Sequence, residues 1–67
     1  MAQEIIEEVI KRAGGLRAAA RLLNYNLSYL CRVRRGQQKA SFYLFHRINE
    51  VYPDLKPMIL KHIGFGD

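Results

Sequence analysis

Residues 15–36 read GLRAAARLLNYNLSYLCRVRRG, and this segment gives the clearest structural signal in the chain. Its first part, 16–23, consists mainly of alanine and leucine, which are strong helix formers. Asn24 interrupts that run and suits a sharp helix end, because asparagine tolerates the left-handed conformation. Asn26 suits the N-cap of a following helix at 27–35. The segment therefore predicts two short helices joined by a turn of three residues.

The residues on both sides of this segment also show helical periodicity. Apolar side chains recur at helical spacing in 3–13, 41–52 and 54–63, and each range is followed by glycine or proline. Asp54 is expected to cap the last of these helices. Strand-like alternation is missing, so we expect an all-α fold of five short helices in one domain, 1–67. The residues expected to face the core from these three helices are Ile5, Ile6, Val9, Ile10, Ala13, Leu44, Phe45, Ile48, Val51, Tyr52, Leu55, Ile59 and Ile63.

Positive charge is concentrated in the middle of the sequence. The chain of 67 residues carries a formal net charge of +5, and three of its six acids lie within the first eight residues. The span from Lys11 to Asn49 contains no acid but holds nine lysines and arginines. This balance favours an anionic partner such as nucleic acid. A solvated basic surface without a partner is the alternative that the composition leaves open.

The sequence lacks the residue sets that catalysis or metal binding needs. His46 and His62 are isolated, and with the single cysteine, Cys31, they form no zinc-type spacing. It contains no nucleophile–base–acid set and no glycine-rich phosphate loop. One cysteine allows no internal disulfide, and no segment approaches the roughly 18 apolar residues of a membrane span. We therefore expect a cytoplasmic protein that is not an enzyme and uses no cofactor, metal, membrane or small-molecule ligand.

The same 22-residue segment meets the positional demands of a helix-turn-helix. Ala20 supplies the small residue that faces the second helix, and Leu23 supplies the apolar anchor of the turn. Asn24 follows at the position that needs a positive φ. Leu30 and Val33 stand where the second helix should bury its side chains. The spacing therefore predicts the motif independently of any single residue.

On these residues, Gly15 to Gly36 resembles the helix-turn-helix of phage lambda repressor and Cro proteins and of the wider repressor-like superfamily. The likeness has no gap, and the other expected helices are placed as that fold places them. Two positions depart from the family pattern: Asn24 replaces the usual glycine, and Leu16 stands where a polar phosphate-contacting residue such as glutamine is common. The resemblance implies a lambda repressor-like domain whose helix-turn-helix spans 16–35 and whose second helix enters the major groove.

A helical wheel identifies the exposed strip of the helix at 27–35. With Leu30 directed at the core, Ser28, Arg32 and Arg35 lie within about 40° of the opposite direction. Arg32 has the planar fork that suits O6 and N7 of guanine, and it matches a base-reading position of the family. We expect base contacts from Leu27, Ser28, Tyr29, Cys31 and Arg32, and phosphate contacts from Arg17, Asn26, Arg34, Arg35 and Lys39.

Several of these residues also have a purely structural interpretation. Tyr29 is equally consistent with packing on a neighbouring helix, and Leu27 with the edge of the core. Cys31 is consistent with an inert small residue that faces the groove. Arg32 is consistent with a solubilising surface arginine. The sequence alone leaves these alternatives open.

A second copy of the chain is expected to bind beside the first. One recognition helix gives poorly selective binding, and members of the family dimerise so that two helices lie about 34 Å apart on a palindrome. Met58, Leu60 and Phe65 point away from the core-facing side of the helix and tail at 54–67, which predicts a homodimer surface there. Completion of a compact monomer core by these residues is the alternative.

The function expected from these features is sequence-specific transcriptional regulation. The predicted partner is double-stranded DNA with a palindromic operator, and the predicted activity is repression by a small dimer of the Cro-like or autoregulator type. Two other functions would use the same basic face: a non-specific DNA- or RNA-binding module, and a protein-interaction adaptor.

Overall fold

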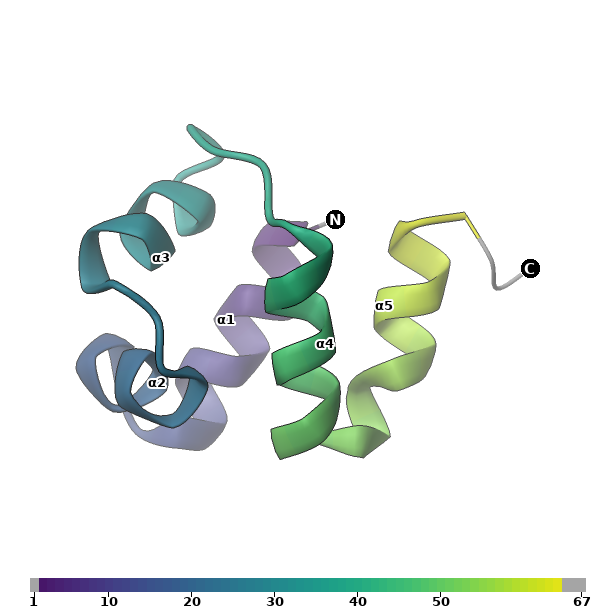
Figure 1. Ribbon diagram of the computed structural model, residues 1–67, viewed down its shortest axis with the longest axis horizontal. Helices are drawn as coiled ribbons and strands as arrows, with labels where there is room; N and C mark the ends of the chain where they lie inside the picture. The colour runs from purple at the N-terminus through teal and green to yellow at the C-terminus, as the bar shows by residue number, and fades with distance from the viewer. Residues whose placement is uncertain (1, 65–67) are drawn as a thin grey trace.

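Helices account for all the regular structure in residues 2–64, the range that the computed structural model describes (Figure 1). Within it the chain forms five α-helices and one 3-10 turn and no strand, which confirms the all-α prediction. The predicted boundaries agree to within two residues. The elements are α1 (Ala2–Ala13), α2 (Leu16–Leu23), α3 (Leu27–Arg34), α4 (Phe42–Val51), the 3-10 turn η1 (Pro53–Leu55) and α5 (Lys56–His62).

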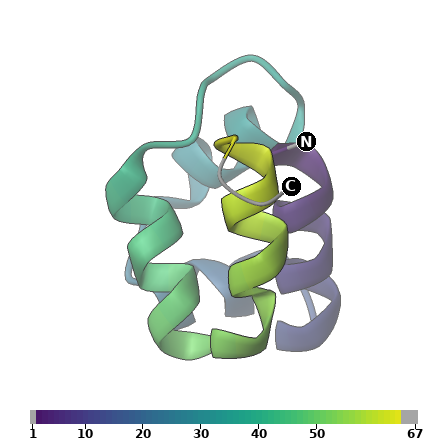
Figure 2. The same cartoon turned by 90° about the vertical axis from the view of Figure 1, so that its right-hand side faces the viewer.

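The helix α1 connects the two sides of the molecule. It contacts α2 and α3 on one side and α5 on the other, while α4 contacts α2 and η1. Figure 1 shows α2 and α3 together at the left and α5 at the right, with α4 facing the viewer between them. Figure 2 shows α5 between α4 and α1. The α2–α3 pair is therefore presented at one end of the molecule, supported from behind by α1.

Every described helix contributes apolar side chains to one core. The stripes predicted for 3–13 and 41–52 are largely buried, and the remaining predicted residues (Ile10, Ala13, Val51, Tyr52 and Ile63) are partly buried against them. Removing an aliphatic side chain from water contributes about 1.5–3 kcal/mol. The buried set is Ile5, Ile6, Val9, Ala19, Ala20, Leu23, Leu30, Val33, Leu44, Phe45, Ile48, Leu55 and Ile59.

Two asparagines set the turn between α2 and α3, as the sequence predicts. Asn24 has φ 57° and ψ 46°, so it ends α2 in the left-handed conformation. The Tyr25 amide then donates to the carbonyl of Ala20 at 3.0 Å. Asn26 is extended and caps α3, because its Oδ1 accepts from the amides of Ser28 at 2.8 Å and Tyr29 at 3.4 Å. The turn thereby fixes the direction in which α3 leaves α2.

The prediction that Asp54 caps the last helix is wrong. Pro53 starts a 3-10 turn that contains Asp54, and α5 begins afterwards with Leu55 at its N-cap and no side-chain cap. Asp54 lies in the middle of that turn, two residues before α5, so it does not stand at the N-cap position, which Leu55 occupies. The Asp54 carboxylate instead binds the Arg12 guanidinium, with Nη1 and Oδ2 2.7 Å apart. Asp54 therefore ties η1 to the end of α1.

Arg12 also contacts two other residues near the end of α1. Its Nε donates to Glu8 at 2.9 Å, and its guanidinium lies 5.5 Å from the centre of the Tyr52 ring. The hydrogen bond to Glu8, and then the one to Asp54, raise the pKa of Arg12 above its usual value.

In residues 2–64, none of the helices is both long and apolar enough to cross a membrane.

Candidate nucleic-acid interface

The helix α3 has one buried side and one open side. Leu30 and Val33 are each only 1% exposed and hold the helix against the core. Ser28, Arg32 and Arg35 are exposed, in agreement with the helical wheel. The structure therefore brings three of the predicted site residues to one surface. Their contact with DNA remains a prediction.

A shallow depression of about 340 Å³ lies at the junction of this open side with α2. Leu16 and Leu27 supply apolar lining, and the partly buried thiol of Cys31 lies between them and the arginines. Four of the five predicted base-contacting residues line it: Leu27, Ser28, Cys31 and Arg32; Arg35 joins them. An apolar surface bordered by guanidinium groups suits both the methyl group of thymine and the acceptor atoms of guanine.

Tyr29, the fifth predicted base-contacting residue, lies elsewhere. Its ring stacks on Tyr25 with the ring centres 5.5 Å apart. Its hydroxyl accepts from the amide of Ser41 at 3.0 Å and donates to the carbonyl of Lys39 at 3.4 Å. These contacts match the packing alternative, because they direct Tyr29 at the loop 36–41. Tyr29 therefore fastens that loop to α3.

Among the predicted phosphate contacts, Arg34 is directed away from the open side. Its Nε lies 3.1 Å from Glu7 Oε2 on α1, which makes an ion pair between the two helices. The helical wheel explains this position, since Arg34 lies only about 40° from the buried Leu30. The helical wheel thus separates Arg34 from the exposed strip of Ser28, Arg32 and Arg35. A contact between Arg34 and a phosphate stays a prediction.

The other predicted phosphate contacts remain on the surface. Arg17, Arg35 and Lys39 are exposed. Asn26 is exposed as well, but its Oδ1 is engaged in capping α3, so only its amide N–H groups are left to donate. Arg21, which is not among the residues predicted to contact DNA, lines a second shallow hollow with Arg17 beside the α2–α3 turn. Its spacing of four residues from Arg17 places both side chains on one face of α2.

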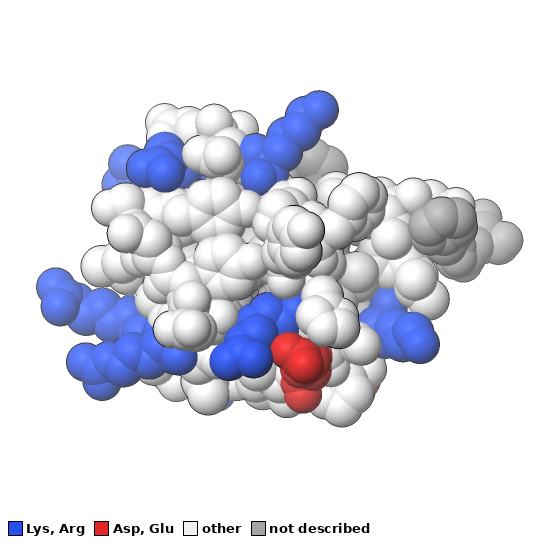
Figure 3. Space-filling view, in the orientation of Figure 1, with Lys and Arg blue, Asp and Glu red and all other residues white. Residues whose placement is uncertain are grey.

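Ion pairing divides the arginines into two groups. Arg12, Arg34 and Arg47 each have a carboxylate within salt-bridge distance. In the described residues, no acid lies within that distance of the arginines on α2 and on the open side of α3, which are Arg17, Arg21, Arg32 and Arg35. Figure 3 shows basic side chains projecting from the α2–α3 side and others over α4 and α5, with a small acidic area near the end of α4. The α2–α3 end therefore carries four arginines without an ion pair. The lysines of the described residues, which are Lys11, Lys39, Lys56 and Lys61, have no acid within that distance either.

Apolar side chains also reach the surface away from α3. Of the predicted dimer residues, Met58 is 36% exposed and Leu60 is partly buried, while Phe65 lies outside the described residues, as does the tail at 65–67. Phe42 and Tyr43, at the start of α4, are far more exposed. Among the described residues, the most exposed large apolar side chains therefore lie at the start of α4, and Met58 is the exposed one on α5.

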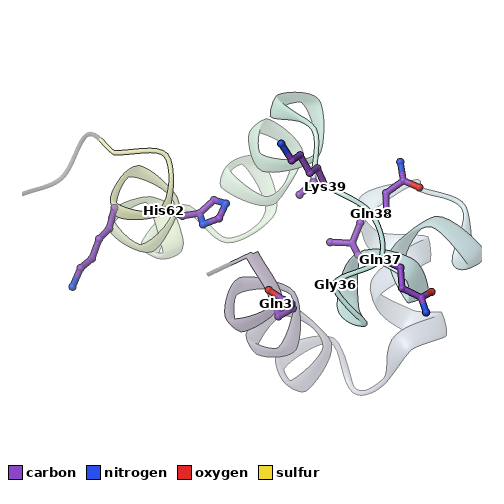
Figure 4. Close-up of a pocket in the computed structure, with 9 residues that line it drawn as sticks. Gln3, Gly36, Gln37, Gln38, Lys39 and His62 are labelled. Carbon is purple, nitrogen blue, oxygen red and sulfur yellow. The ribbon is translucent and has the colours of Figure 1, made fainter.

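A further hollow of about 710 Å³ separates the loop 36–41 from the end of α5. Figure 4 shows His62 and Gln3 across from the loop that carries Gly36, Gln37, Gln38 and Lys39. In the part of the chain that the structure describes, no three His, Cys, Asp or Glu side chains gather as a metal site would need. The side chains around this open hollow are mainly the amides of glutamines and the basic groups of Lys39, Lys61 and His62.

Comparison with known proteins gives no additional information about this surface. No family model, curated protein or solved structure matches the chain. The case for a function therefore rests on the residues of the α2–α3 end and on their geometry.

Proposed function

We propose that the protein is a cytoplasmic, sequence-specific DNA-binding regulator, and not an enzyme, which inserts α3 into the major groove of double-stranded DNA. The observation that carries this proposal is the open side of α3. Ser28, Arg32 and Arg35 project there together, and no carboxylate within residues 2–64 neutralises either arginine. Leaving such charges unpaired suits a surface that meets phosphates and base edges.

The size and support of α3 are consistent with this role. An α-helix with its side chains is about 10–12 Å across, which fits the width of the major groove, and the eight residues of α3 give it a length of about 12 Å. Arg17 and Arg21 extend the basic surface along α2. In the proposed complex these two residues and Arg35 neutralise phosphates, while Arg32 and Ser28 contact base edges.

We propose further that the protein acts as a homodimeric repressor. One short helix reaches only a few base pairs, so selectivity requires two copies on half-sites about 34 Å apart. Met58 and Leu60 on α5, with Phe65, are the proposed dimer contacts, and the partial exposure of Met58 supports this choice. Occupation of a promoter by the dimer would exclude RNA polymerase.

Selection from a random pool of duplex DNA at about 150 mM salt tests this function. Non-specific phosphate binding weakens steeply with salt, so base readout dominates the selection. We expect an enriched palindrome that is bound at least about 10³-fold more tightly than scrambled DNA. An absence of enrichment, with binding that disappears in salt, would refute the operator hypothesis and favour a non-specific or RNA-binding module.

A further inference from the structure

Arg32 has one specific protein partner, a glutamine in the following loop. Its Nε donates to Oε1 of Gln38 at 3.1 Å. Within residues 2–64 this is the hydrogen bond that its side chain makes, so both terminal NH₂ groups stay available. The partner is neutral, so it orients the guanidinium without removing its charge. This differs from Arg34, two positions later, whose partner is an acid.

The loop holds Gln38 in a defined place relative to α3. On one side, the Gln37 amide donates to the carbonyl of Arg32 at 2.9 Å. On the other side, the Tyr29 hydroxyl bonds the carbonyl of Lys39 and the amide of Ser41. The backbone is thus attached to α3 both before and after Gln38. A glutamine on a free loop would be a weak partner, but this one is fixed at both ends.

Gly36 also helps to place this loop relative to α3. Its φ of 77° lies in the left-handed region, and a Cβ there would come within 2.5 Å of the side-chain nitrogen of Gln3. Glycine therefore lets the chain turn sharply after α3, close to Gln3 in the first turn of α1. Figure 4 shows the side chains of Gln37 and Gln38 directed to different sides of this loop. Within the described residues, Gln38 is the one of the two whose side chain is bonded to the side chain of Arg32.

We infer that Gln38 is a positioning residue that directs Arg32 to guanine, an inference that rests on the proposed function. With Nε held by Gln38, the remaining donor edge of Arg32 consists of Nη1 and Nη2. Two parallel N–H donors at that edge match the O6 and N7 acceptors of guanine in the major groove, whereas adenine presents a donor in place of O6. A guanidinium already held in one orientation also loses less side-chain freedom on binding.

The test compares the base preferences of variants. Gln38→Met keeps the length of the side chain but removes the acceptor. Gln37→Met makes the same change at the neighbour, whose backbone amide, and not its side chain, bonds Arg32. Gln38→Glu keeps an acceptor for Nε while adding a negative charge. Each protein is put through the random-pool selection and then titrated with the selected site and with the same site carrying adenine for each guanine.

We expect the wild type to prefer guanine at one position per half-site, and Arg32→Ala to abolish that preference. Gln38→Met should lower the guanine-to-adenine ratio by about three- to tenfold, a part of what one bidentate contact contributes. Gln37→Met should leave the ratio unchanged. Gln38→Glu should keep the ratio but weaken binding to all sequences, because the added charge repels phosphates.

The outcomes separate this inference from the proposed function. If the wild type enriches no sequence, both fail. If it enriches a site with an Arg32-dependent guanine but Gln38→Met keeps the full ratio, Gln38 does not position Arg32, while the DNA-binding function stands. A uniform loss of affinity with an unchanged ratio would likewise overturn the inference, since it would make Gln38 a phosphate contact. Thermal unfolding checks the fold, and Gln38→Ala provides a second variant without the acceptor.

Discussion

Arg32 and Arg34 lie two residues apart on α3, yet they belong to two different regions of the molecule. Arg34 faces α1 and forms an ion pair with Glu7 at 3.1 Å. Arg32 faces outward, and its bonded partner is the neutral amide of Gln38. The comparison shows that the net charge of +5 is not equally available over the surface. Charge near α1 stabilises contacts between helices, whereas charge on the open side is left for an external anion.

Among the substitutions that test this difference between Arg32 and Arg34, Arg32→Ala is expected to have the largest effect on DNA recognition. A bidentate arginine–guanine contact accounts for about 1–3 kcal/mol of discrimination, which is roughly five- to 150-fold in relative affinity. The substitution should therefore reduce the preference for the selected site over a site with one changed base, as measured by competition titration. Arg34→Ala is the matched control, because it removes the same side chain from the same helix and should leave discrimination intact. Equal losses in both variants would mean that the two regions do not differ in function.

A second prediction concerns the N-cap of α3, which Asn26 provides. Asn26→Ala removes the acceptor that caps the amides of Ser28 and Tyr29, and loss of an N-cap costs about 1 kcal/mol. We expect a corresponding fall in the free energy of unfolding in urea, together with weaker DNA binding. Asn26→Ser, which retains a capping oxygen, should recover most of the stability. If Asn26→Ala weakened DNA binding without changing stability, Asn26 would be a direct phosphate contact.

The third prediction tests the basic surface of α2. Arg17 is exposed and has no acid within salt-bridge distance in the described residues, so it is a proposed phosphate contact. Each phosphate contact contributes close to one unit to the slope of log K against log salt concentration. Arg17→Ala should therefore lower the magnitude of that slope by about one and weaken all sequences by a few-fold. An unchanged slope would place Arg17 outside the DNA interface.

The sequence predicts features that depend on neighbouring residues better than features that depend on distant ones. Asn24 and Asn26 act within three residues of themselves, so their backbone roles could be predicted from residue type. The buried side of α3 follows in the same way from helical periodicity. These local rules were enough to predict five helices and the exposed strip of α3.

Side-chain partners across the fold were not predictable in this way. Arg34 pairs with an acid 27 positions earlier, and Arg12 with one 42 positions later. The Tyr29 hydroxyl reaches backbone groups 10 and 12 positions away. Such contacts require the relative placement of elements, which periodicity does not give. For the same reason the role of Gln38 beside Arg32 emerged only from the structure.

The smallest effect is expected from removing the acid that pairs with Arg34, which leaves Arg34 without an ion pair, as Arg32 is. Glu7→Gln removes the carboxylate but keeps the shape of the side chain. Both partners are about half exposed, so the pair contributes at most about 1 kcal/mol, and urea unfolding should show a loss of that size or less that disappears in high salt. Affinity for DNA of any sequence should rise slightly at low salt because one negative charge is gone, while the base preference should not change. Arg34→Ala/Glu7→Gln completes a double-mutant cycle that isolates the pair. A new base preference in Glu7→Gln would show that Arg34 reaches the groove once it is released, and pairing with Glu7 would then control specificity as well as stability.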